Sequence, residues 1–375
     1  MAGLYIHIPF CKQACFYCNF HFTTSKKSIS NTVDAIIIEL ISRKNYLNSN
    51  KIDTIYFGGG TPSVLNNNDI DKIFNAIYKH YEISENAEVS FECNPDDLTT
   101  EKINFLNKTP INRLSIGIQS FNDKDLEYLN RSHNANNAIR SIENSKKYFN
   151  NITIDLIYGI PTLSSNDWKN NLNMINKLDI PHFSAYCLTV EPQTPLFIFI
   201  KNNKIKPIDE NLGIENFKQV IEFAKLNNFV HYEISNFSKE NYFSKHNLGY
   251  WQNKNYVGIG AGAHSYNGNS RQWNIANNSE YVMKIKNNEL YYEVENLSVI
   301  ENYNEYVFTS LRTIWGCDKN YINNNFGEKF LNYFENQALR HIKSENIALQ
   351  NTNYILTEKG LFLADNITSD LFYIE

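Results

Sequence analysis

The chain has 375 residues, 42% of them hydrophobic, which is enough for one large α/β domain and a smaller second one. Its formal net charge is −5, from 35 Lys and Arg against 40 Asp and Glu, and no basic run stands out. This balance argues against the electrostatic surface that nucleic-acid binding requires, so no nucleic-acid partner is expected. The sequence contains no stretch of about 18 or more apolar residues, so no transmembrane helix is expected, while peripheral contact with a membrane stays an alternative.

Six cysteines are present, and three of them, Cys11, Cys15 and Cys18, fall within eight residues. The other three lie far apart, so they do not form a disulfide framework of regular spacing. Clustering of this kind is typical of a metal site in a cytoplasmic protein. With no secretory signal at the start of the chain, we expect a cytoplasmic location.

The first two thirds of the chain alternate strand and helix patterns. Strands are predicted at residues 3–9, 51–57, 87–93, 113–118, 152–158 and 182–190. Helical patterns between them are predicted at residues 30–46, 68–81, 100–107, 123–129, 136–148 and 166–178. Six such units imply βαβ crossovers and a parallel sheet. The sequence therefore predicts an α/β fold with a partial (β/α)6 barrel over residues 1–200, whose ligands bind at the carboxyl ends of the strands.

The remainder is less regular. Residues 201–300 are predicted to extend the barrel, and residues 301–375 to form an α-rich C-terminal domain. The end of the chain resembles a winged-helix module. Its pattern predicts a helix, two short strands near 347–349 and 354–356, and a last helix. With no basic patch, this module is expected to pack on the barrel or cover its ligand rather than read DNA.

Cys11, Cys15 and Cys18 have the spacing C-x3-C-x2-C directly after the first predicted strand. Three thiolates on one short loop can hold three corners of an iron–sulfur cube and leave the fourth iron open. An open iron can bind the amino and carboxylate groups of S-adenosylmethionine (SAM) and pass an electron to its sulfonium. From spacing alone, two alternatives remain: a zinc site completed by His21, since structural zinc takes four ligands, and three thiols with no metal.

The wider segment from Tyr5 to Cys18 (YIHIPFCKQACFYC) resembles the cluster loop of the radical SAM superfamily. More narrowly, it resembles the oxygen-independent coproporphyrinogen III oxidase family and the heme chaperones related to it, and the resemblance runs over nearly the whole chain. It implies a [4Fe–4S] cluster on Cys11, Cys15 and Cys18, with SAM beside it at the carboxyl end of the barrel.

The same resemblance implies a set of SAM contacts at successive strand ends. The motifs that carry it are GGGTP at 58–62, ECNP at 92–95, SIGIQSF at 115–121, RSH at 131–133 and DLIYGIP at 155–161. The implied contacts are Tyr5, Gly59, Gly60, Thr61, Glu92, Gln119, Arg131 and Asp155. Independently, glycines allow a backbone to approach a ligand closely, and polar residues at barrel strand ends suit ligand binding. Taken singly, the glycines could equally form a tight turn, and each polar residue could equally be a solvated loop residue. Tyr5 could equally be an ordinary aromatic residue of a strand.

Three features separate the heme chaperones from the oxidase. Phe20 stands where the oxidase has a further cysteine, and the first strand begins at residue 3 without the oxidase's long preceding segment. The run from His246 through Tyr250 to Trp251 (HNLGYW) matches a motif typical of the chaperone group. All three favour the chaperone.

His246, Tyr250 and Trp251 are the candidate heme-binding residues. Heme iron takes an axial histidine, and aromatic rings flank a macrocycle well. The alternative is a structural histidine in an aromatic-rich loop. Rival ligands that the sequence does not rank are His7, His231 and His264.

The sequence therefore predicts a radical SAM heme chaperone that holds a [4Fe–4S] cluster, SAM and heme. Its expected partners are a heme-acceptor protein, such as a respiratory hemoprotein, and an electron donor for the cluster. One alternative is the oxidase itself, which removes two propionate carboxyls of coproporphyrinogen III. A second alternative is a radical SAM enzyme with another substrate.

Overall fold

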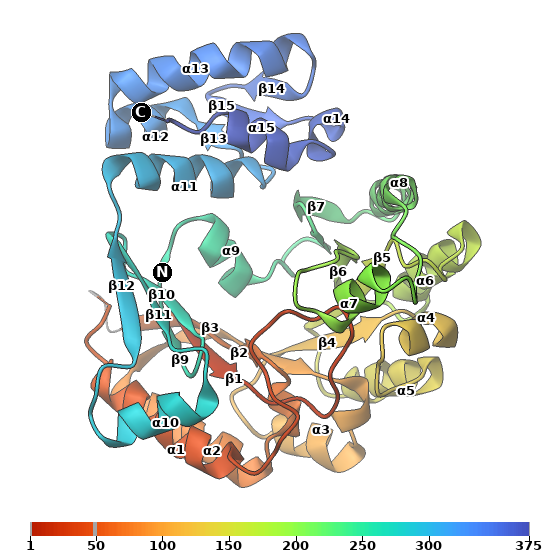
Figure 1. Cartoon of the computed structure of the whole chain (residues 1–375), viewed down its shortest axis with the longest axis vertical. Helices are drawn as coiled ribbons and strands as arrows, with labels where there is room; N and C mark the ends of the chain where they lie inside the picture. Colours follow the sequence, from red (N-terminus) through yellow and green to blue (C-terminus); the bar gives the residue numbers. More distant parts are fainter. Residues whose placement is uncertain (1, 48–50, 375) are drawn as a thin grey trace.

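The computed structural model describes residues 2–47 and 51–374, and its larger part is built around one mixed sheet. In this part of the chain the sheet has 12 strands in the order β12-β11-β10-β9-β1-β2-β3-β4-β5-β6-β8-β7. Figure 1 shows helices on the outer side of this curved sheet and a separate module above it. The two edge strands do not pair with each other, so the barrel is open.

The centre of the sheet is the predicted run of parallel strands. They are β1 (Ala2–Ile8), β2 (Lys51–Gly59), β3 (Glu82–Cys93), β4 (Arg113–Gln119), β5 (Ile152–Tyr158) and β6 (His182–Cys187). Each pairs in parallel with the next, which confirms the partial barrel of β/α units. The last strand ends at Cys187, three residues before the predicted end.

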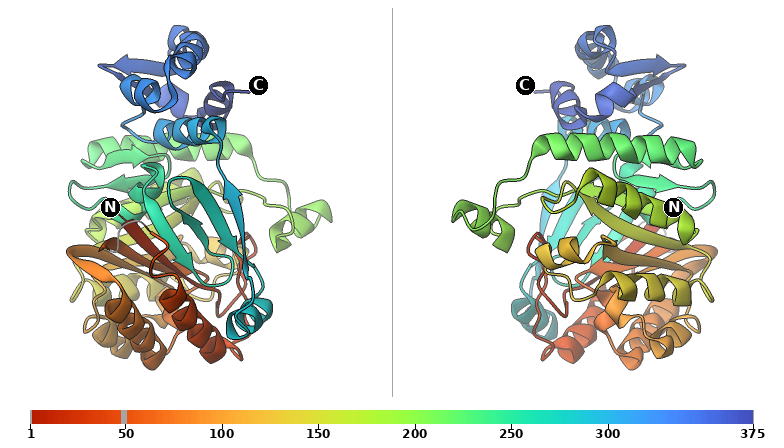
Figure 2. Two further views of the ribbon diagram at one scale, coloured as in Figure 1. Left: turned by 90° about the vertical axis from the view of Figure 1, so that its left-hand side faces the viewer. Right: turned by 90° about the vertical axis from the view of Figure 1, so that its right-hand side faces the viewer.

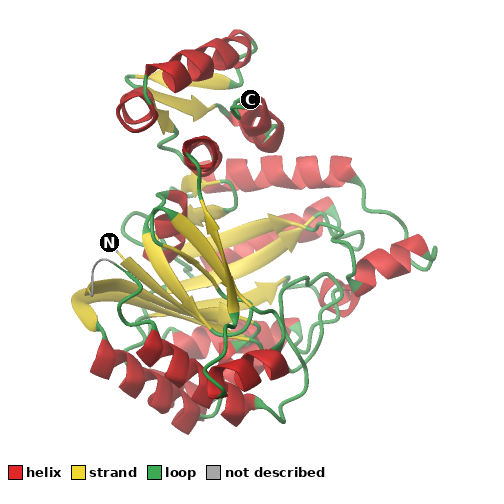
Figure 3. Cartoon of the chain, turned by 60° about the vertical axis from the view of Figure 1, so that its left-hand side comes forward, coloured by secondary structure: helices red, strands yellow, loops and turns green. Residues whose placement is uncertain are grey.

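The crossover helices cover the outer face of these strands (Figure 3). They are α1 (Ile29–Ser42), α2 (Asn67–His80), α3 (Thr100–Leu106), α4 (Asp123–Tyr128), α5 (Ala135–Ser145) and α6 (Ser165–Lys177). All but α1 begin behind a polar residue whose side-chain oxygen accepts a backbone N–H of the first turn, the usual N-cap. These caps are Asn66, Thr99, Asn122, Asn134 and Ser164.

Beyond residue 187 the chain adds strands to both edges of the sheet. On one edge α7 (Pro195–Lys201) and α8 (Glu210–Leu226) lead to antiparallel β7 (Val230–Glu233) and β8 (Asn236–Ser238). On the other, α9 (Lys245–Trp251) leads to β9 (Asn255–Ile259), which pairs in parallel with β1. Antiparallel β10 (His264–Tyr266), β11 (Ser270–Asn274) and β12 (Tyr292–Asn296) follow, with α10 (Asn278–Lys286) between the last two. The domain boundaries at residues 200 and 300 stay predictions.

A buried carboxylate on α1 fastens this second edge to the barrel. Glu39 has no exposed surface, and its two oxygens accept hydrogen bonds from the Gly260 N–H (2.8 Å), the Tyr281 hydroxyl (2.6 Å) and the Asn274 amide (2.8 Å). Arg43, one turn further along α1, lies 3.5 Å from the same carboxylate. Burial raises the pKa of Glu39, and the Arg43 charge opposes that shift. The carboxylate thus joins α1, β9, β11 and α10.

Residues 299–374 form a module with its own core. Its elements are α11 (Val299–Leu311), β13 (Cys317–Asp318), α12 (Lys319–Phe326), α13 (Glu328–Lys343), β14 (Ile347–Gln350), β15 (Asn353–Leu356), α14 (Glu358–Leu361) and α15 (Ala364–Asp370). Tyr303, Phe334 and Ile367 are buried in that core. The arrangement confirms the α-rich, winged-helix-like prediction. Figure 2 shows α8 beneath the module, where the Phe217 and Phe362 rings lie 5.2 Å apart.

Among the described residues, no helix is both long and apolar enough to cross a membrane.

We expect Glu39→Ala to lower the free energy of unfolding by about 3–5 kcal/mol, because the substitution leaves the Arg43 charge buried without its partner. Thermal unfolding followed by circular dichroism checks this. Asp34→Ala, on the exposed face of the same helix, is the matched control and should leave the midpoint nearly unchanged. Equal midpoints for the two variants would show that Glu39 does not fasten the second edge.

Candidate functional site

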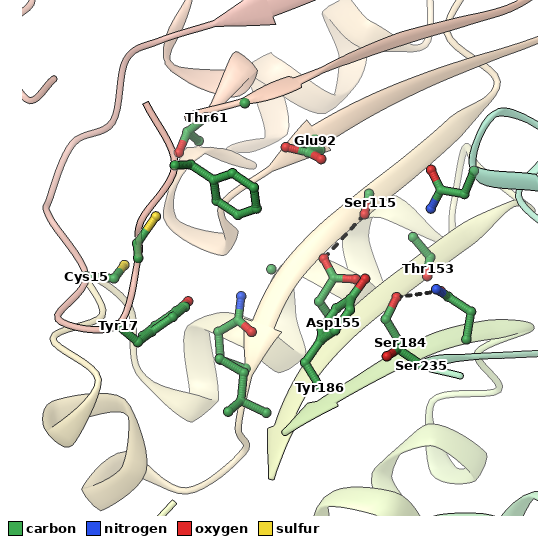
Figure 4. A pocket seen from close by; sticks show the side chains of 18 of the residues that line it. Cys15, Tyr17, Thr61, Glu92, Ser115, Thr153, Asp155, Ser184, Tyr186 and Ser235 are labelled. Atoms are coloured by element: carbon green, nitrogen blue, oxygen red, sulfur yellow. Dashed lines mark hydrogen bonds between the residues drawn. The ribbon is translucent and has the colours of Figure 1, made fainter. Parts of the chain in front are cut away.

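The three clustered cysteines lie on the loop that follows β1, at the carboxyl end of the parallel strands. All three side chains are partly buried and line a cavity of about 650 Å³ on the concave side of the sheet (Figure 4). Backbone hydrogen bonds hold the loop at both ends: the Cys11 N–H donates to the Thr23 carbonyl (3.0 Å), and the Phe16 N–H to the Leu129 carbonyl (3.2 Å). The loop is therefore supported by neighbouring segments.

Two of the thiols receive hydrogen bonds from side chains that also line the cavity. The Thr61 hydroxyl donates to Cys11 Sγ (3.3 Å), and Arg131 Nη1 donates to Cys15 Sγ (3.2 Å). Arg131 is itself fixed by Nη2, which donates to Asn94 Oδ1 (2.7 Å) and to the Gly117 carbonyl (2.8 Å). Burial raises the pKa of the Cys11 thiol to about 11, so a thiolate here requires positive charge beside it. An iron–sulfur cluster supplies that charge, and hydrogen bonds to sulfur are a usual means of tuning one.

The donor geometry suits a cluster better than a single zinc ion. Zinc would need His21 as fourth ligand, but His21 Nε2 is hydrogen bonded to Asn278 Oδ1 (2.7 Å), and its ring stacks on that of His7. Within the described residues, no three His, Cys, Asp or Glu side chains converge on one point where a metal ion could sit. A four-iron cube binds each cysteine at a separate corner, so its ligands do not have to converge in that way.

The predicted strand-end residues come together on one wall of the cavity. Glu92, Gln119, Arg131 and Asp155 all line it, together with Thr61 and the glycines at 59 and 60. Strand register explains this: β3 pairs Glu92 with Ser115, and β4 pairs Gly117 with Asp155. Residues that are distant in sequence thereby become neighbours at the carboxyl edge of the sheet.

Gln119 has a backbone conformation that is unusual for its residue type. Its φ is 69°, in the left-handed region, and the pairing of β4 with β5 shifts between Gly117 and Gln119. Strained non-glycine residues and bulges are often found at functional sites, where they redirect a side chain. Here Gln119 lies at the bulge and lines the cavity.

Two carboxyl groups give the wall its electrostatic character. Glu92 Oε1 accepts a hydrogen bond from the Tyr56 hydroxyl (2.7 Å), and Asp155 Oδ2 accepts one from Ser115 (3.4 Å). Burial, with a smaller contribution from the Asp155 charge, raises the pKa of Glu92 to about 7. Burial also raises the pKa of Asp155. A positively charged ligand such as a sulfonium would favour the ionised form of both groups.

The glycines at 59 and 60 also leave room for the protein's own chain, and their assignment as SAM contacts stays a prediction. A side chain at Gly59, whose φ is 104°, would collide with the His7 ring at 2.4 Å. A Cβ at Gly60 would lie 2.7 Å from the Ile8 carbonyl oxygen and 2.8 Å from the Phe10 nitrogen. The absent side chains therefore make room for the start of the cluster loop as well as for a ligand.

Tyr5 lies behind the cavity wall. Its hydroxyl is hydrogen bonded to His7 Nδ1 (3.0 Å), and its ring stacks on Tyr56, which does line the cavity. Its assignment as a SAM contact stays a prediction.

The candidate heme residues lie on α9, outside the cavity lining. His246 is 3% exposed, with Nδ1 hydrogen bonded to the Thr54 hydroxyl (2.8 Å) and Nε2 to the Tyr250 hydroxyl (2.9 Å). Burial lowers the pKa of His246 to about 3, so it is neutral. Both ring nitrogens are occupied, and coordination of heme iron by His246 would require one of these bonds to break. The indole of Trp251 lies 5.9 Å from the Arg312 guanidinium carbon.

The rival histidines differ in accessibility. His7 bonds to Tyr5 and, through Nε2, to the His21 carbonyl (3.0 Å), while His231 Nε2 bonds to the Ile234 carbonyl (3.0 Å). His264, on β10, is exposed beside Trp273.

The sequence interpretation missed the residues that line the rest of the cavity. They include Arg113, Ser115, Thr153, His182, Ser184 and Tyr186, with Asn247 from α9 and Arg312 and Asp365 from the C-terminal module. Polar residues at alternate positions within three otherwise apolar strands were the available signal, because alternate residues of a strand share one face.

Comparison with known proteins agrees with this geometry. The model of the radical SAM superfamily matches residues 5–175. The heme chaperone HemW of Bacillus subtilis is 30% identical over 98% of this chain and 98% of its own length. The corresponding Lactococcus lactis protein is 32% identical, over 97% and 95%. The chain belongs to the HemW family of the radical SAM superfamily. Membership of the superfamily implies a [4Fe–4S] cluster and SAM.

A solved structure shares the fold. The coproporphyrinogen III oxidase HemN of Escherichia coli, described as a radical SAM enzyme, superposes with a TM-score of 0.85 over 99% of this chain and 90% of that one. Its sequence is 20% identical, so this likeness establishes the architecture alone.

We expect Gly60→Ala to lower the cluster content severalfold after anaerobic reconstitution, because the added Cβ would push the backbone next to Cys11. Iron and sulfide analysis with the visible absorbance checks this. The control is Gly249→Ala on α9. The nearest atom to the added Cβ there is 3.8 Å away, so the substitution should leave the cluster content unchanged. A full cluster in the Gly60 variant would contradict this account of the glycine turn.

We expect the affinity for SAM to rise by up to about tenfold as the pH increases from about 6 to about 8, because ionised Glu92 attracts the sulfonium cation. The amino group of SAM titrates in a nearby range, so the wild type is compared with Glu92→Gln. The difference between their profiles isolates the carboxyl group. Equilibrium dialysis under anaerobic conditions measures both, and parallel profiles would count against a contact between Glu92 and SAM.

Proposed function

We propose that this chain binds heme and passes it to an acceptor protein, with a [4Fe–4S] cluster and SAM held at the carboxyl end of its half-barrel. The observation that carries the proposal is the sequence identity of 30% and 32% to two heme chaperones over almost the full length of the chains compared. The cavity geometry supports it, since the cysteine loop and the strand-end residues meet in one place (Figure 4).

In this proposal Cys11, Cys15 and Cys18 hold the cluster, and Arg131 fixes the orientation of Cys15 through its hydrogen bond to Sγ. When bound, the reduced cluster can supply one electron to SAM. Glu92 and Asp155 would attract the positive charge of SAM. Arg131 Nε is buried without a partner and could donate a hydrogen bond to a carboxylate oxygen of SAM. The full proposed set of SAM contacts is the one the sequence predicted: Tyr5, Gly59, Gly60, Thr61, Glu92, Gln119, Arg131 and Asp155.

The proposed heme site is the region of α9 around His246, Tyr250 and Trp251. Because Thr54 and Tyr250 occupy the ring nitrogens of His246, iron coordination there would require the histidine to exchange a hydrogen bond for the metal. The proposal also includes a heme acceptor, such as a respiratory hemoprotein, and an electron donor that reaches the cluster loop.

A hemin titration of anaerobically reconstituted protein, followed through the Soret band, tests the function. We expect saturation near one heme per chain, and a weaker complex with an altered spectrum for His246→Ala. His264→Ala is the matched control, because that histidine is exposed on a neighbouring strand. Loss of binding in the control alone would move the ligand to β10. Absence of saturable binding by protein with an intact cluster would contradict the chaperone function.

A further inference from the structure

The part of the cavity farthest from the cysteines is built from polar side chains. Strand register stacks them in rows across the sheet: Ser115 of β4 pairs with Thr153 of β5, and Thr153 with His182 of β6. Ser184 lies in the next row, opposite Asp155. Figure 4 shows Ser115, Thr153, Asp155 and Ser184 along one wall. An inner wall of this kind is suited to a polar group rather than to an apolar ring.

Arg113, at the start of β4, lines this end of the cavity and is 1% exposed. One of its nitrogens, Nη1, donates to Asn151 Oδ1 (2.6 Å) and to the Tyr242 carbonyl (3.1 Å). The other two nitrogens, Nε and Nη2, are buried and have no hydrogen-bond partner. Since arginine stays protonated in proteins, both N–H groups represent unsatisfied donors next to a cavity.

The carboxyl group nearest in effect to Arg113 is Asp155, whose pKa the Arg113 charge helps to lower against the effect of burial, but the two groups form no ion pair. Among the described residues, no carboxylate lies within salt-bridge distance of its guanidinium. Its neighbour His182 is neutral, because burial and the Arg113 charge hold its pKa well below the usual value. A buried charge without a partner is strongly destabilising. Such a residue is retained where a ligand supplies the missing charge.

The unpartnered atoms have the geometry of a carboxylate receptor. Nε and Nη2 form one edge of the planar guanidinium, and their parallel N–H bonds can reach both oxygens of a carboxylate. Nη1, which anchors the neighbouring segments, lies on the other side. Anchoring of those segments uses Nη1 alone, so it does not account for the unpaired edge formed by Nε and Nη2.

We propose that Arg113 forms a carboxylate subsite that receives a propionate side chain of the heme. This inference rests on the proposed function and names the part of the ligand that enters the barrel. Hydroxyl and imidazole groups lie beside the guanidinium, and the Asp155 carboxyl lies one row nearer the cluster end, so the acidic arm enters at Arg113 while the apolar macrocycle stays nearer α9. Asn247 connects the two regions, since it lies on α9 and lines the cavity.

The test compares the affinities of iron protoporphyrin IX and of its dimethyl ester, whose propionates carry no charge. We expect the wild type to bind the free acid at least about tenfold more tightly than the ester, since hydrogen bonds to charged groups are the strong ones. Arg113→Gln should remove this preference and leave ester binding unchanged. Arg113→Lys, which keeps the charge but not the bidentate edge, should retain part of it. Arg140→Gln, an exposed change of the same charge on α5, is the control.

The outcomes separate the two proposals. Equal affinity of the wild type for acid and ester would overturn the carboxylate subsite while the chaperone function stands. This comparison uses the wild type alone, so it does not depend on whether the variants fold. A preference that persists in Arg113→Gln would place the carboxylate elsewhere and would also overturn the assignment. Binding of neither porphyrin by cluster-loaded wild type would overturn the proposed function itself. Cluster content and SAM affinity show that each variant is folded.

Discussion

The cluster loop depends on two backbone hydrogen bonds that continue the pairing of β1 with β2 beyond the ends of both strands. The Gly60 N–H donates to the Ile8 carbonyl (3.0 Å), and the Thr61 N–H to the Phe10 carbonyl (2.8 Å). They hold the two segments so close that no side chain fits at Gly60. As a result Cys11 leaves the sheet at a defined point, with the Thr61 hydroxyl already beside its sulfur.

Charged side chains line the cavity at both ends of its parallel strands, and Arg131 lies with the carboxyl groups at the cluster end. Carboxyl groups lie beneath the cluster loop, where Glu92 and Asp155 create a site for positive charge. A guanidinium lies at the amino end of the same strands, where Arg113 creates a site for negative charge. Both kinds of residue are placed by strand register alone, because alternate residues of β3 to β6 face inward. One sheet can therefore present two ligand sites of opposite charge within a single cavity.

Local patterns made much of this predictable from the sequence. The six parallel strands and the loop of Cys11, Cys15 and Cys18 follow from periodicity and spacing over short windows. The strand at 255–259 was missed because its partner β1 lies some 250 residues earlier, and pairing at that separation leaves no local signal. His246 Nδ1 is occupied by Thr54, and Arg113 Nη1 by Asn151 and Tyr242, all of which are distant in sequence. A sequence motif therefore shows neither the occupied histidine nor the unpaired edge of the arginine.

The position of β1 in the sheet has a consequence for biosynthesis. The strand that leads into the cluster loop is the first to be made, yet it lies between β2 and β9, and β9 ends at Ile259. At a translation rate of roughly 5–20 residues per second, about 10–50 s pass before its second neighbour exists. During that interval Cys11, Cys15 and Cys18 lie on the loop after a strand that has one side unpaired. Delivery of iron and sulfide to the finished site is thus an event of late synthesis or of the released chain.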